Sequence, residues 1–267
     1  MLRKTFPARR LCVAALMACV LTAPASSQEH REKELPKSSG EVTFSAELVK
    51  TGLYMISGGG GNTLLRLSAN GLILVDGKLP GNYRALMSQV RKISKLSDMP
   101  VRVLIVTDHH PNRAGNSAQF LAAGIPILVQ QEAQRYLETP DPSGAKVARI
   151  VSYRDYVVRM GGVEARALHF GSAHTGGDTV VYFPNLRVVA VGDLYTPDTP
   201  EVDFAGGGSL MNWGPVLAEV LKLDFDVVAP SAGPTVTRAD LETFKTRMDT
   251  LIARASALVK TASPRIS

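Results

Sequence analysis

The chain has 267 residues, of which 45% are hydrophobic and 20% are charged, and this globular composition excludes a disordered or fibrous protein. Its length is enough to bury the core of one or two domains. The formal net charge of +6 does not indicate a nucleic-acid partner, because the sequence has no long basic run and no basic stripe interleaved with aromatic residues.

The first 25 residues have the pattern of a secretory signal peptide. A basic start, an apolar run and a small-residue cleavage pattern follow one another as MLRKTFPARR, LCVAALMACVLT and APA. Cleavage after Ala25 would give a periplasmic or secreted protein whose net charge falls from +6 to +2, because four basic residues leave with the signal. The apolar run is shorter than the roughly 18 residues that a membrane-spanning helix needs, so we expect no stable membrane insertion.

Cys19 leaves one alternative open. The run Leu16-Met17-Ala18-Cys19 loosely resembles a lipoprotein cleavage box, which would attach a lipid anchor to Cys19, although Met17 fits that box badly. Cys12 and Cys19 are the two cysteines of the chain, so a protein cut after Ala25 would have no disulfide and no thiolate ligand.

Residues 26–41 are polar and charged and are expected to form a flexible leader, which leaves 42–267 for the folded domain. The domain begins with runs typical of β-strands, VTFSAELV, LYMI, NTLLRL and GLILVD, separated by Gly, Ser and Asn. The break Ser57–Gly61 predicts a flexible hairpin turn and not a phosphate-binding loop, because no Gly-Lys-Ser/Thr follows it.

From Asn82 the apolar residues recur at helical intervals, and the chain then alternates between strands and helices. We expect strands at VRVLIV and IPILV, and helices at SAQFLAAG and QQEAQRYLE. Further strands are expected at VSYRDYVVRM, VEARALHF, DTVVYF and LRVVAVGD, then a helix near Trp213–Leu223, the strand DVVAP and a helix from Thr237 or Arg238 to about Lys260. This order predicts an α/β fold in which two sheets pack face to face with helices outside.

Three segments end an apolar strand with polar residues of the kinds that bind metals. They are TDHHPNR at 107–113, GSAHTGGDT at 171–179 and VVAVGDLYTP at 188–197. A fourth segment, VVAPSAGPTVTRADL at 227–241, has the same position after a strand but brings no ligand. Because strand ends are where a rigid scaffold presents side chains to a ligand, we expect these segments to form one site.

In this order and spacing, the four segments resemble the motifs of the metallo-β-lactamase superfamily, and the similarity extends from about Val42 to the C-terminal helix. The family pattern is Thr-His-x-His-x-Asp-His in the first segment, Gly-x-x-His-Thr in the second, Gly-Asp in the third and Gly-His-Gly in the fourth. The resemblance implies an αβ/βα sandwich of two mixed sheets with outer helices, and a hydrolase that binds one or two zinc ions.

The sequence departs from the family pattern at four ligand positions, three of which belong to the same metal. The family's first histidine, aspartate, third histidine and final histidine fall on Asp108, Asn112, Arg113 and Ala232, whereas His110, His174 and Asp193 are retained. The resemblance therefore implies that Asp108, His110 and His174 can still bind one metal, with Asp193 beside it. Two histidines and a carboxylate suit Zn²⁺, and also Fe²⁺ or Mn²⁺.

Arg113 and Asn112 suggest what replaced the second metal. We hypothesise that the guanidinium of Arg113 occupies its place and pairs with Asp193, because arginine is a permanent planar cation that fits a carboxylate in bidentate fashion, with two nitrogens on two oxygens. Asn112 can hold a water molecule but cannot take its proton, so a weaker or alkaline-shifted activity is expected.

The sequence leaves two functions open. The first is an exported, metal-dependent hydrolase of a small molecule, with a lactam, lactone, ester, thioester or phosphodiester as substrate. The second is a non-catalytic binding protein that has kept the fold. Converging donor atoms of Asp108, His110 and His174 favour the first, and the sequence indicates no oligomeric state.

Other polar and aromatic residues near these motifs have structural interpretations. His109 would point away from His110 if the strand continued, and His169 is expected to pack within its strand. Trp213, with the glycine-rich loop Gly206–Ser209, could face a substrate or fill the core. Asp76 is expected to support the first loop. Thr175 and Asp178 are expected to shape the second.

Overall fold

The computed structural model describes residues 43–94, 99–137, 149–152 and 154–262. The predicted signal segment 1–25 and leader 26–41 lie outside the described residues. The chain divides after Pro36, and everything described below belongs to the unit from Lys37 onward. No described helix is both long and apolar enough to span a membrane.

The first sheet contains seven strands in sequence order. They are β1 (Ser45–Lys50), β2 (Leu53–Ser57), β3 (Thr63–Ser68), β4 (Gly71–Val75), β5 (Val101–Ile105), β6 (Ile127–Gln130) and β7 (Arg149–Ser152). Strands β1 to β4 form an antiparallel meander, whereas β4, β5, β6 and β7 pair in parallel. The parallel strands are joined by helices, so their carboxyl ends lie on one edge.

The second sheet contains six strands in the order β13-β12-β11-β10-β9-β8. They are β8 (Asp155–Met160), β9 (Val163–Leu168), β10 (Val180–Phe183), β11 (Val188–Gly192), β12 (Val227–Pro230) and β13 (Val236–Thr237). A short 3₁₀ helix, Pro184–Leu186, joins β10 to β11. Strands β11 and β12 pair in parallel, and the other neighbours are antiparallel. Both sheets are therefore mixed.

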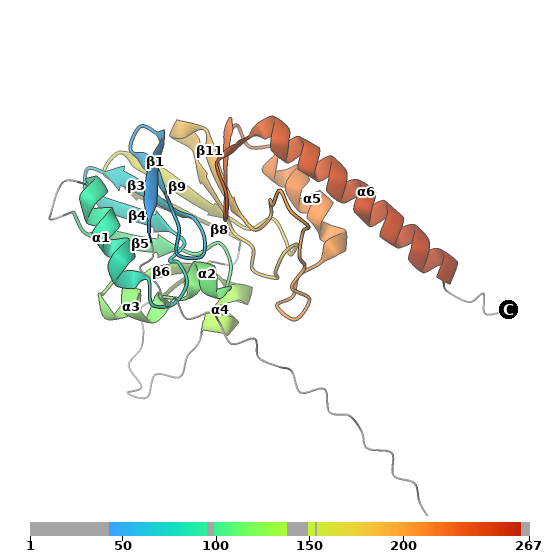
Figure 1. Ribbon diagram of the computed structural model, residues 1–267, viewed down its shortest axis with the longest axis horizontal. Helices are drawn as coiled ribbons and strands as arrows, with labels where there is room; N and C mark the ends of the chain where they lie inside the picture. Colours follow the sequence, from blue (N-terminus) through green and yellow to red (C-terminus); the bar gives the residue numbers. More distant parts are fainter. Residues whose placement is uncertain (1–42, 95–98, 138–148, 153, 263–267) are drawn as a thin grey trace, which may run out of the picture. The chain divides into compact units, whose positions relative to one another are not determined.

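Helices cover the outer face of each sheet (Figure 1). They are α1 (Tyr83–Ser94), α2 (Pro111–Ala114), α3 (Ser117–Ala122), α4 (Gln131–Leu137), α5 (Leu210–Val220) and α6 (Arg238–Ala262). One apolar cluster lies between the sheets, a second lies beneath α1, α3 and α4, and a third lies beneath α5 and α6. This layering confirms the αβ/βα sandwich expected from the sequence.

Two expected elements differ from the observed ones. The run VSYRDYVVRM was predicted as one strand, but β7 ends at Ser152 in the first sheet and β8 begins at Asp155 in the second. A continuous β-like pattern cannot reveal that the chain changes sheets within it. The helix expected near Trp213 begins earlier, at Leu210.

The hairpin turn predicted at Ser57–Gly61 joins β2 to β3, and Lys78 makes hydrogen bonds to the backbone on both sides of it. Lys78 has no exposed surface, and its Nζ donates to the carbonyl oxygens of Ile56, at 2.5 Å, and Gly61. Gly58, Gly59 and Gly60 have positive φ values of 98°, 64° and 93°, which glycine adopts at no steric cost. Burial lowers the pKa of Lys78 to about 7, although the charge of Asp76 opposes the shift.

Replacing Lys78 by methionine is expected to change how stability depends on pH. Between about pH 7 and 10.5 the unfolded chain binds a proton on this lysine that the folded chain does not bind. The free energy of unfolding should therefore rise with pH in that window, by at most about 1.4 kcal/mol per pH unit. The free energy of unfolding, measured with urea at several pH values, should rise less steeply with pH for Lys78→Met than for the exposed control Lys92→Met. Equal slopes would show that Lys78 stays charged when buried.

Candidate metal centre

The first motif loop begins where β5 ends, and Asp76 at the end of β4 fixes its start. Asp76 Oδ1 accepts the Thr107 backbone N–H at 2.8 Å, and Oδ2 accepts the Thr107 hydroxyl at 2.9 Å. Burial raises the pKa of Asp76 to about 7, although the charge of Arg113 opposes the shift. These contacts agree with the supporting role that the sequence predicted for Asp76.

The second motif loop is shaped by Asp178. Its Oδ2 accepts the N–H of Ala173 at 3.0 Å, and its Oδ1 accepts the N–H and hydroxyl of Thr175 at 2.8 and 2.6 Å. Because Ala173 and Thr175 flank His174, the buried carboxylate fixes the backbone that carries this histidine. The predicted role of Thr175 and Asp178 is thereby confirmed.

Replacing Asp178 by alanine is expected to destabilise the fold by about 3 kcal/mol, because several buried donors lose their acceptor. Urea unfolding measures the change, and Asp198→Ala, which removes an exposed carboxylate, is the matched control. If the two variants lost equal stability, Asp178 would not be the residue that fixes the His174 loop.

Four predicted ligands come together between the two sheets' loops. One donor atom each from Asp108, His110, His174 and Asp193 lies within 4.8 Å of the others. His110 Nδ1 is 3.2 Å from both Asp108 Oδ1 and His174 Nε2, and His174 Nε2 is 3.5 Å from Asp193 Oδ2. Tetrahedral donors about 2.1 Å from a zinc ion are separated by about 3.4 Å, so these separations fit one metal ion.

The hydrogen bond made by His174 Nδ1, the ring nitrogen that faces away from the cluster, determines which nitrogen has the free lone pair. His174 Nδ1 lies 2.8 Å from the carbonyl oxygen of Glu201, which can only accept a hydrogen bond. Nδ1 therefore carries the proton in the neutral ring, and the lone pair of Nε2 faces His110 and Asp193. A hydrogen bond of this kind on the outer nitrogen is the usual support of a metal-binding histidine.

The Arg113 side chain pairs with Asp193, as the sequence suggested. Its Nη2 lies 2.7 Å from both Asp193 oxygens, so one nitrogen makes both contacts and the expected two-nitrogen fork does not form. Ser231 Oγ donates a further hydrogen bond to Asp193 Oδ1. Gly61 makes room for the guanidinium, since a Cβ there would lie only 2.5 Å from Arg113 Nη1.

Arg113 also sets the charge balance of the site. The side chain is 1% exposed, and its Nε lies 3.8 Å from Asp108 Oδ2 and 3.9 Å from Asp76 Oδ2. Burial by itself would raise the pKa of Asp108, but the hydrogen bond with His110 and the charges of Arg113 and His110 lower it to about 2. Asp108 is therefore an anion at neutral pH. The contact with Asp108 raises the pKa of His110.

The remaining predicted residues lie outside the four-residue cluster. Asn112 is half-buried in α2, and Ala232 is exposed after β12. His169 Nδ1 lies 2.7 Å from the Asp178 carbonyl oxygen, as expected for a histidine packed at its strand. Trp213 is fully buried and donates from Nε1 to the Leu194 carbonyl oxygen at 3.0 Å. Of its two interpretations, the core role is confirmed.

The expectation that His109 points away from His110 was wrong. Strand β5 ends at Ile105, so side-chain alternation does not extend to these residues. Their rings stack with centroids 4.6 Å apart, and Tyr136 of α4 stacks on the other side of His109 at 4.0 Å. Both Nε2 atoms face Asp203, which sequence reasoning missed together with Ser231. Asp203 lies in none of the four motif segments, and Ser231 stands in the fourth, where the family pattern has the first glycine of Gly-His-Gly.

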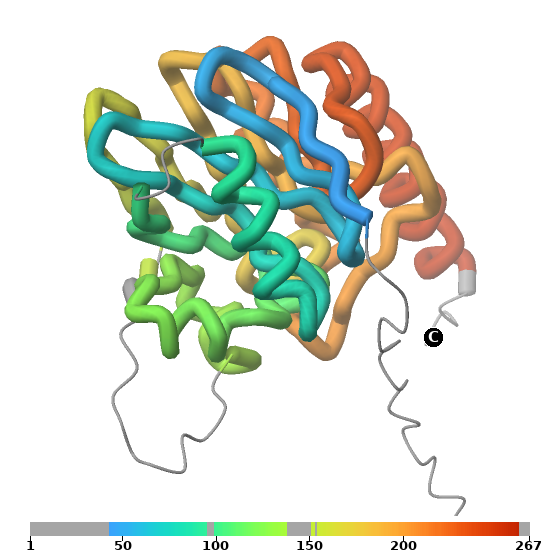
Figure 2. Tube along the Cα trace, turned by 60° about the vertical axis from the view of Figure 1, so that its left-hand side comes forward, coloured from blue at the N-terminus to red at the C-terminus, as the bar shows by residue number. Residues whose placement is uncertain are grey.

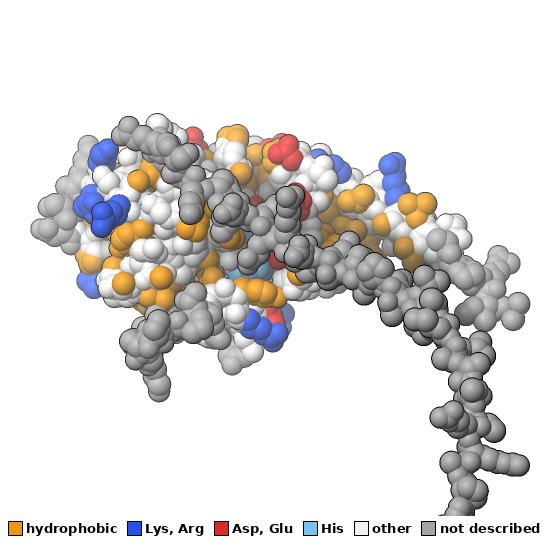
Figure 3. All heavy atoms as spheres, turned by 60° about the horizontal axis from the view of Figure 1, so that its bottom comes forward, with side chains coloured by type: hydrophobic (Ala, Val, Ile, Leu, Met, Phe, Trp, Pro, Cys, Tyr) orange, Lys and Arg blue, Asp and Glu red, His pale blue; other side chains and the backbone are white. Residues whose placement is uncertain are grey.

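The site is accessible from one face of the molecule. Figure 3 shows a histidine at the surface of that face with hydrophobic side chains beside it. The His110 side chain is 28% exposed, whereas Asp108 is 1% exposed. Figure 2 shows the segment between β11 and α5 passing along the edge where α4 lies, and Tyr136 Oη donates to the Ala205 carbonyl oxygen there at 2.9 Å. A ligand can therefore approach His110 from solvent.

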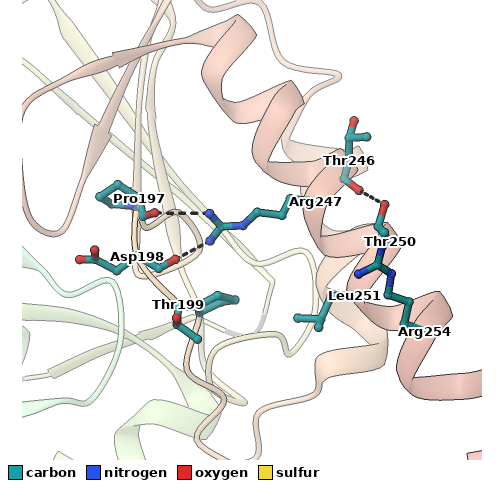
Figure 4. Close-up of a pocket in the computed structure, with 9 residues that line it drawn as sticks. Pro197, Asp198, Thr199, Thr246, Arg247, Thr250, Leu251 and Arg254 are labelled. Carbon is teal, nitrogen blue, oxygen red and sulfur yellow. Dashed lines mark hydrogen bonds between the residues drawn. The ribbon is translucent and has the colours of Figure 1, made fainter. Parts of the chain in front are cut away.

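A separate cavity of about 710 Å³ lies between residues 197–200 and α6 (Figure 4). Arg247 crosses it and donates to the backbone carbonyl oxygens of Pro197, at 3.3 Å, and Asp198. None of the four clustered ligands lines this cavity.

Comparison with solved structures identifies the fold. The metallo-beta-lactamase from Pontibacter korlensis superposes with a TM-score of 0.66 at 17% identity, covering 78% of this chain and 99% of the other. FIM-1 from Pseudomonas aeruginosa, solved in its mono-zinc form, superposes with a TM-score of 0.65 at 19% identity, covering 80% of this chain and 97% of the other.

Sequence comparison identifies the family. The 2,4-dinitroanisole O-demethylase subunit alpha of Nocardioides sp. (strain JS1661) is 26% identical over 213 residues, which are 78% of this chain and 63% of the relative. Metallo-beta-lactamase IND-1 of Chryseobacterium indologenes is 27% identical over 133 residues, which are 50% of this chain and 54% of the relative. The chain thus spans less than two thirds of either relative. The model of the Metallo-beta-lactamase superfamily matches residues 57–232. The chain therefore belongs to this superfamily.

Proposed function

We propose that this protein is a metal-dependent hydrolase that acts on a small molecule with a single metal ion. The observation that carries the proposal is the convergence of donor atoms from Asp108, His110 and His174, with Asp193 beside them. These residues would hold Zn²⁺, or alternatively Fe²⁺ or Mn²⁺. When bound, such an ion supplies Lewis acidity and lowers the pKa of a coordinated water molecule.

Each residue around the cluster has a task that follows from its contacts. Arg113 compensates the charge of Asp193 and keeps a fixed positive charge beside the ligands. Asp108 donates more negative charge than the histidine that the family pattern has there, so water activation should be weaker. Asn112, if it contacts the substrate side, can orient a water molecule but cannot accept its proton. A modest activity that increases at alkaline pH is the expected result.

Candidate substrates are lactams, lactones, esters, thioesters and phosphodiesters, because the fold alone does not select among them. The similarity to a 2,4-dinitroanisole O-demethylase subunit adds that nitroaromatic ether to the compounds worth testing. We further propose export to the periplasm or beyond the cell, with cleavage after Ala25.

The alternative is a binding protein that has kept the fold and lost the chemistry. The replacement of metal-site positions by Asn112, Arg113 and Ala232 favours it, whereas the convergence of the remaining donors favours the hydrolase. Arg113 engages Asp193 and leaves His110 Nδ1 and His174 Nε2 facing each other, so it does not fill the space between them.

A substrate screen with the zinc-, iron- and manganese-loaded protein tests the proposal. Turnover of any of the named classes that disappears on chelation and in Asp108→Ala supports the hydrolase. Metal binding without turnover in the whole screen would favour the binding protein.

Arg113→His tests the one-metal assignment. The variant is expected to gain a second metal, and two metals in the unmodified protein would contradict the assignment.

A further inference from the structure

The segment Glu201–Ser209, here called the strap, crosses over the second motif loop. The Asp203 N–H donates to the His174 carbonyl oxygen at 2.9 Å, and the Ser209 N–H donates to the Ala173 carbonyl oxygen at 2.8 Å. The approach is so close that a Cβ added at Gly208 would collide with the His174 carbonyl oxygen. The strap is therefore part of the support of the candidate metal centre.

The carboxylate of Asp203 points from the strap toward the two adjacent histidines. Its Oδ1 accepts the Gly206 N–H at 2.8 Å, which fixes the side chain within the strap. Its Oδ2 lies 3.2 Å from His109 Nε2 and 3.3 Å from His110 Nε2. For His110, this nitrogen is the one that faces away from Asp108 and His174.

We propose that Asp203 is a positioning residue that orients the His110 ring so that Nδ1 faces the metal position, an inference that rests on the proposed metal site. A carboxylate oxygen only accepts hydrogen bonds, so a nitrogen facing it is stabilised when it carries a proton. Nδ1 itself lies 3.2 Å from Asp108 Oδ1, so without a metal both ring nitrogens face a carboxylate. With a metal on Nδ1 the ring would keep one N–H, on Nε2, and Asp203 would accept it. Through Glu201 and Asp203, the strap thus holds the outer nitrogens of both histidine ligands.

The same three side chains could instead hold a second metal ion, because donors of His109, His110 and Asp203 also lie within 4.8 Å of one another. His109 contradicts this assignment. Its Nδ1 is buried and has no hydrogen-bond partner among the described residues. A ring that ligates through Nε2 must carry its proton on Nδ1, and metal-binding histidines almost always pair that proton with an acceptor. His109 is therefore better placed as a donor to Asp203.

The nitrogen through which His110 binds zinc can be measured. Nitrogen-15 spectra of the zinc-loaded protein distinguish a ring with N–H on Nε2 from a ring with N–H on Nδ1, and the chain has only five histidines to assign. We expect the Nε2–H form for His110 and the Nδ1–H form for His174. In Asp203→Asn, the Nε2–H form of His110 should be joined by the Nδ1–H form, because an amide nitrogen can replace the accepting oxygen.

Zinc affinity provides the second readout, with Asp198→Asn as the matched control. This control makes the same change at an exposed aspartate five residues before Asp203, outside the strap and outside the cluster of proposed ligands. Competition with a chromophoric chelator should show zinc binding weakened about 10- to 100-fold in Asp203→Asn. Asp198→Asn should bind zinc like the unmodified protein.

Four results would overturn the proposal. They are no zinc binding by the unmodified protein, an Nδ1–H form of His110 in its zinc-loaded state, equal zinc affinities of Asp203→Asn and Asp198→Asn, and a second zinc ion that only Asp203→Asn loses. The last result would make Asp203 a ligand. If Asp203→Asn weakens zinc binding as expected but the loaded protein turns over none of the substrates, the positioning role stands and the proposed function fails.

Discussion

Replacing His174 by alanine is expected to abolish metal binding and to lower kcat/KM by about three orders of magnitude, or about 4 kcal/mol of transition-state stabilisation. His174 is the proposed ligand whose geometry is best fixed. Its backbone is held by Asp178 and the strap, and its Nδ1 by Glu201. The loss of metal binding and activity should therefore come from the missing imidazole nitrogen, because the backbone of the loop stays in place.

The matched control is His169→Ala, because His169 follows β9 directly and lies outside the cluster of proposed ligands. Zinc affinity, turnover of the best substrate and the urea midpoint should be measured for both variants. Retention of full zinc affinity by His174→Ala would remove this residue from the site. Equal effects in the two variants would mean that the loss is one of stability.

Replacing Asp193 by alanine is expected to destabilise the fold by about 3–5 kcal/mol, because a buried guanidinium would lose its carboxylate partner. Arg113 is 1% exposed, and its Nε and Nη1 already have no hydrogen-bond partner among the described residues. Nη2, which donates to Asp193, therefore makes the hydrogen bonds of the guanidinium. A second change, Arg113→Met, should restore part of the lost stability in the Asp193→Ala background.

A surface pair offers the control for this prediction. Arg187 and Asp226 form an ion pair at 2.8 Å with side chains 43% and 53% exposed, so Asp226→Ala should cost less than about 1 kcal/mol. Urea unfolding of the unmodified protein and the three variants separates the buried pair from the surface pair. A small loss in Asp193→Ala, or no recovery in the double variant, would show that Arg113 is stable in the core without its partner.

The motif residues of the site could be predicted from the sequence because they follow apolar strands. Asp108 follows β5, Asp193 follows β11 and His174 lies between β9 and β10, and the resemblance to the family placed these segments of two sheets in one site. The pairing of Arg113 with Asp193 followed from charge, since a buried cation needs an anion and the third motif offers one. The metal-binding role of these residues remains a proposal.

The supporting residues could not be predicted, for a physical reason. Asp203 occurs in the run TPEVDFAGGGS, and no local pattern distinguishes its carboxylate from that of Asp198 five residues earlier. Its role depends on the path of the strap across the His174 loop, which long-range contacts determine. The orientation of His109 was predicted wrongly for a similar reason. The prediction used the side-chain alternation of a strand, but β5 ends at Ile105, before His109.

The metal content of the purified protein, measured by elemental analysis after loading with zinc, iron or manganese and removal of the excess, tests the central claim most directly. One metal ion per chain is predicted, and it should be lost in His174→Ala. A protein that stays free of metal with all three ions would contradict the claim.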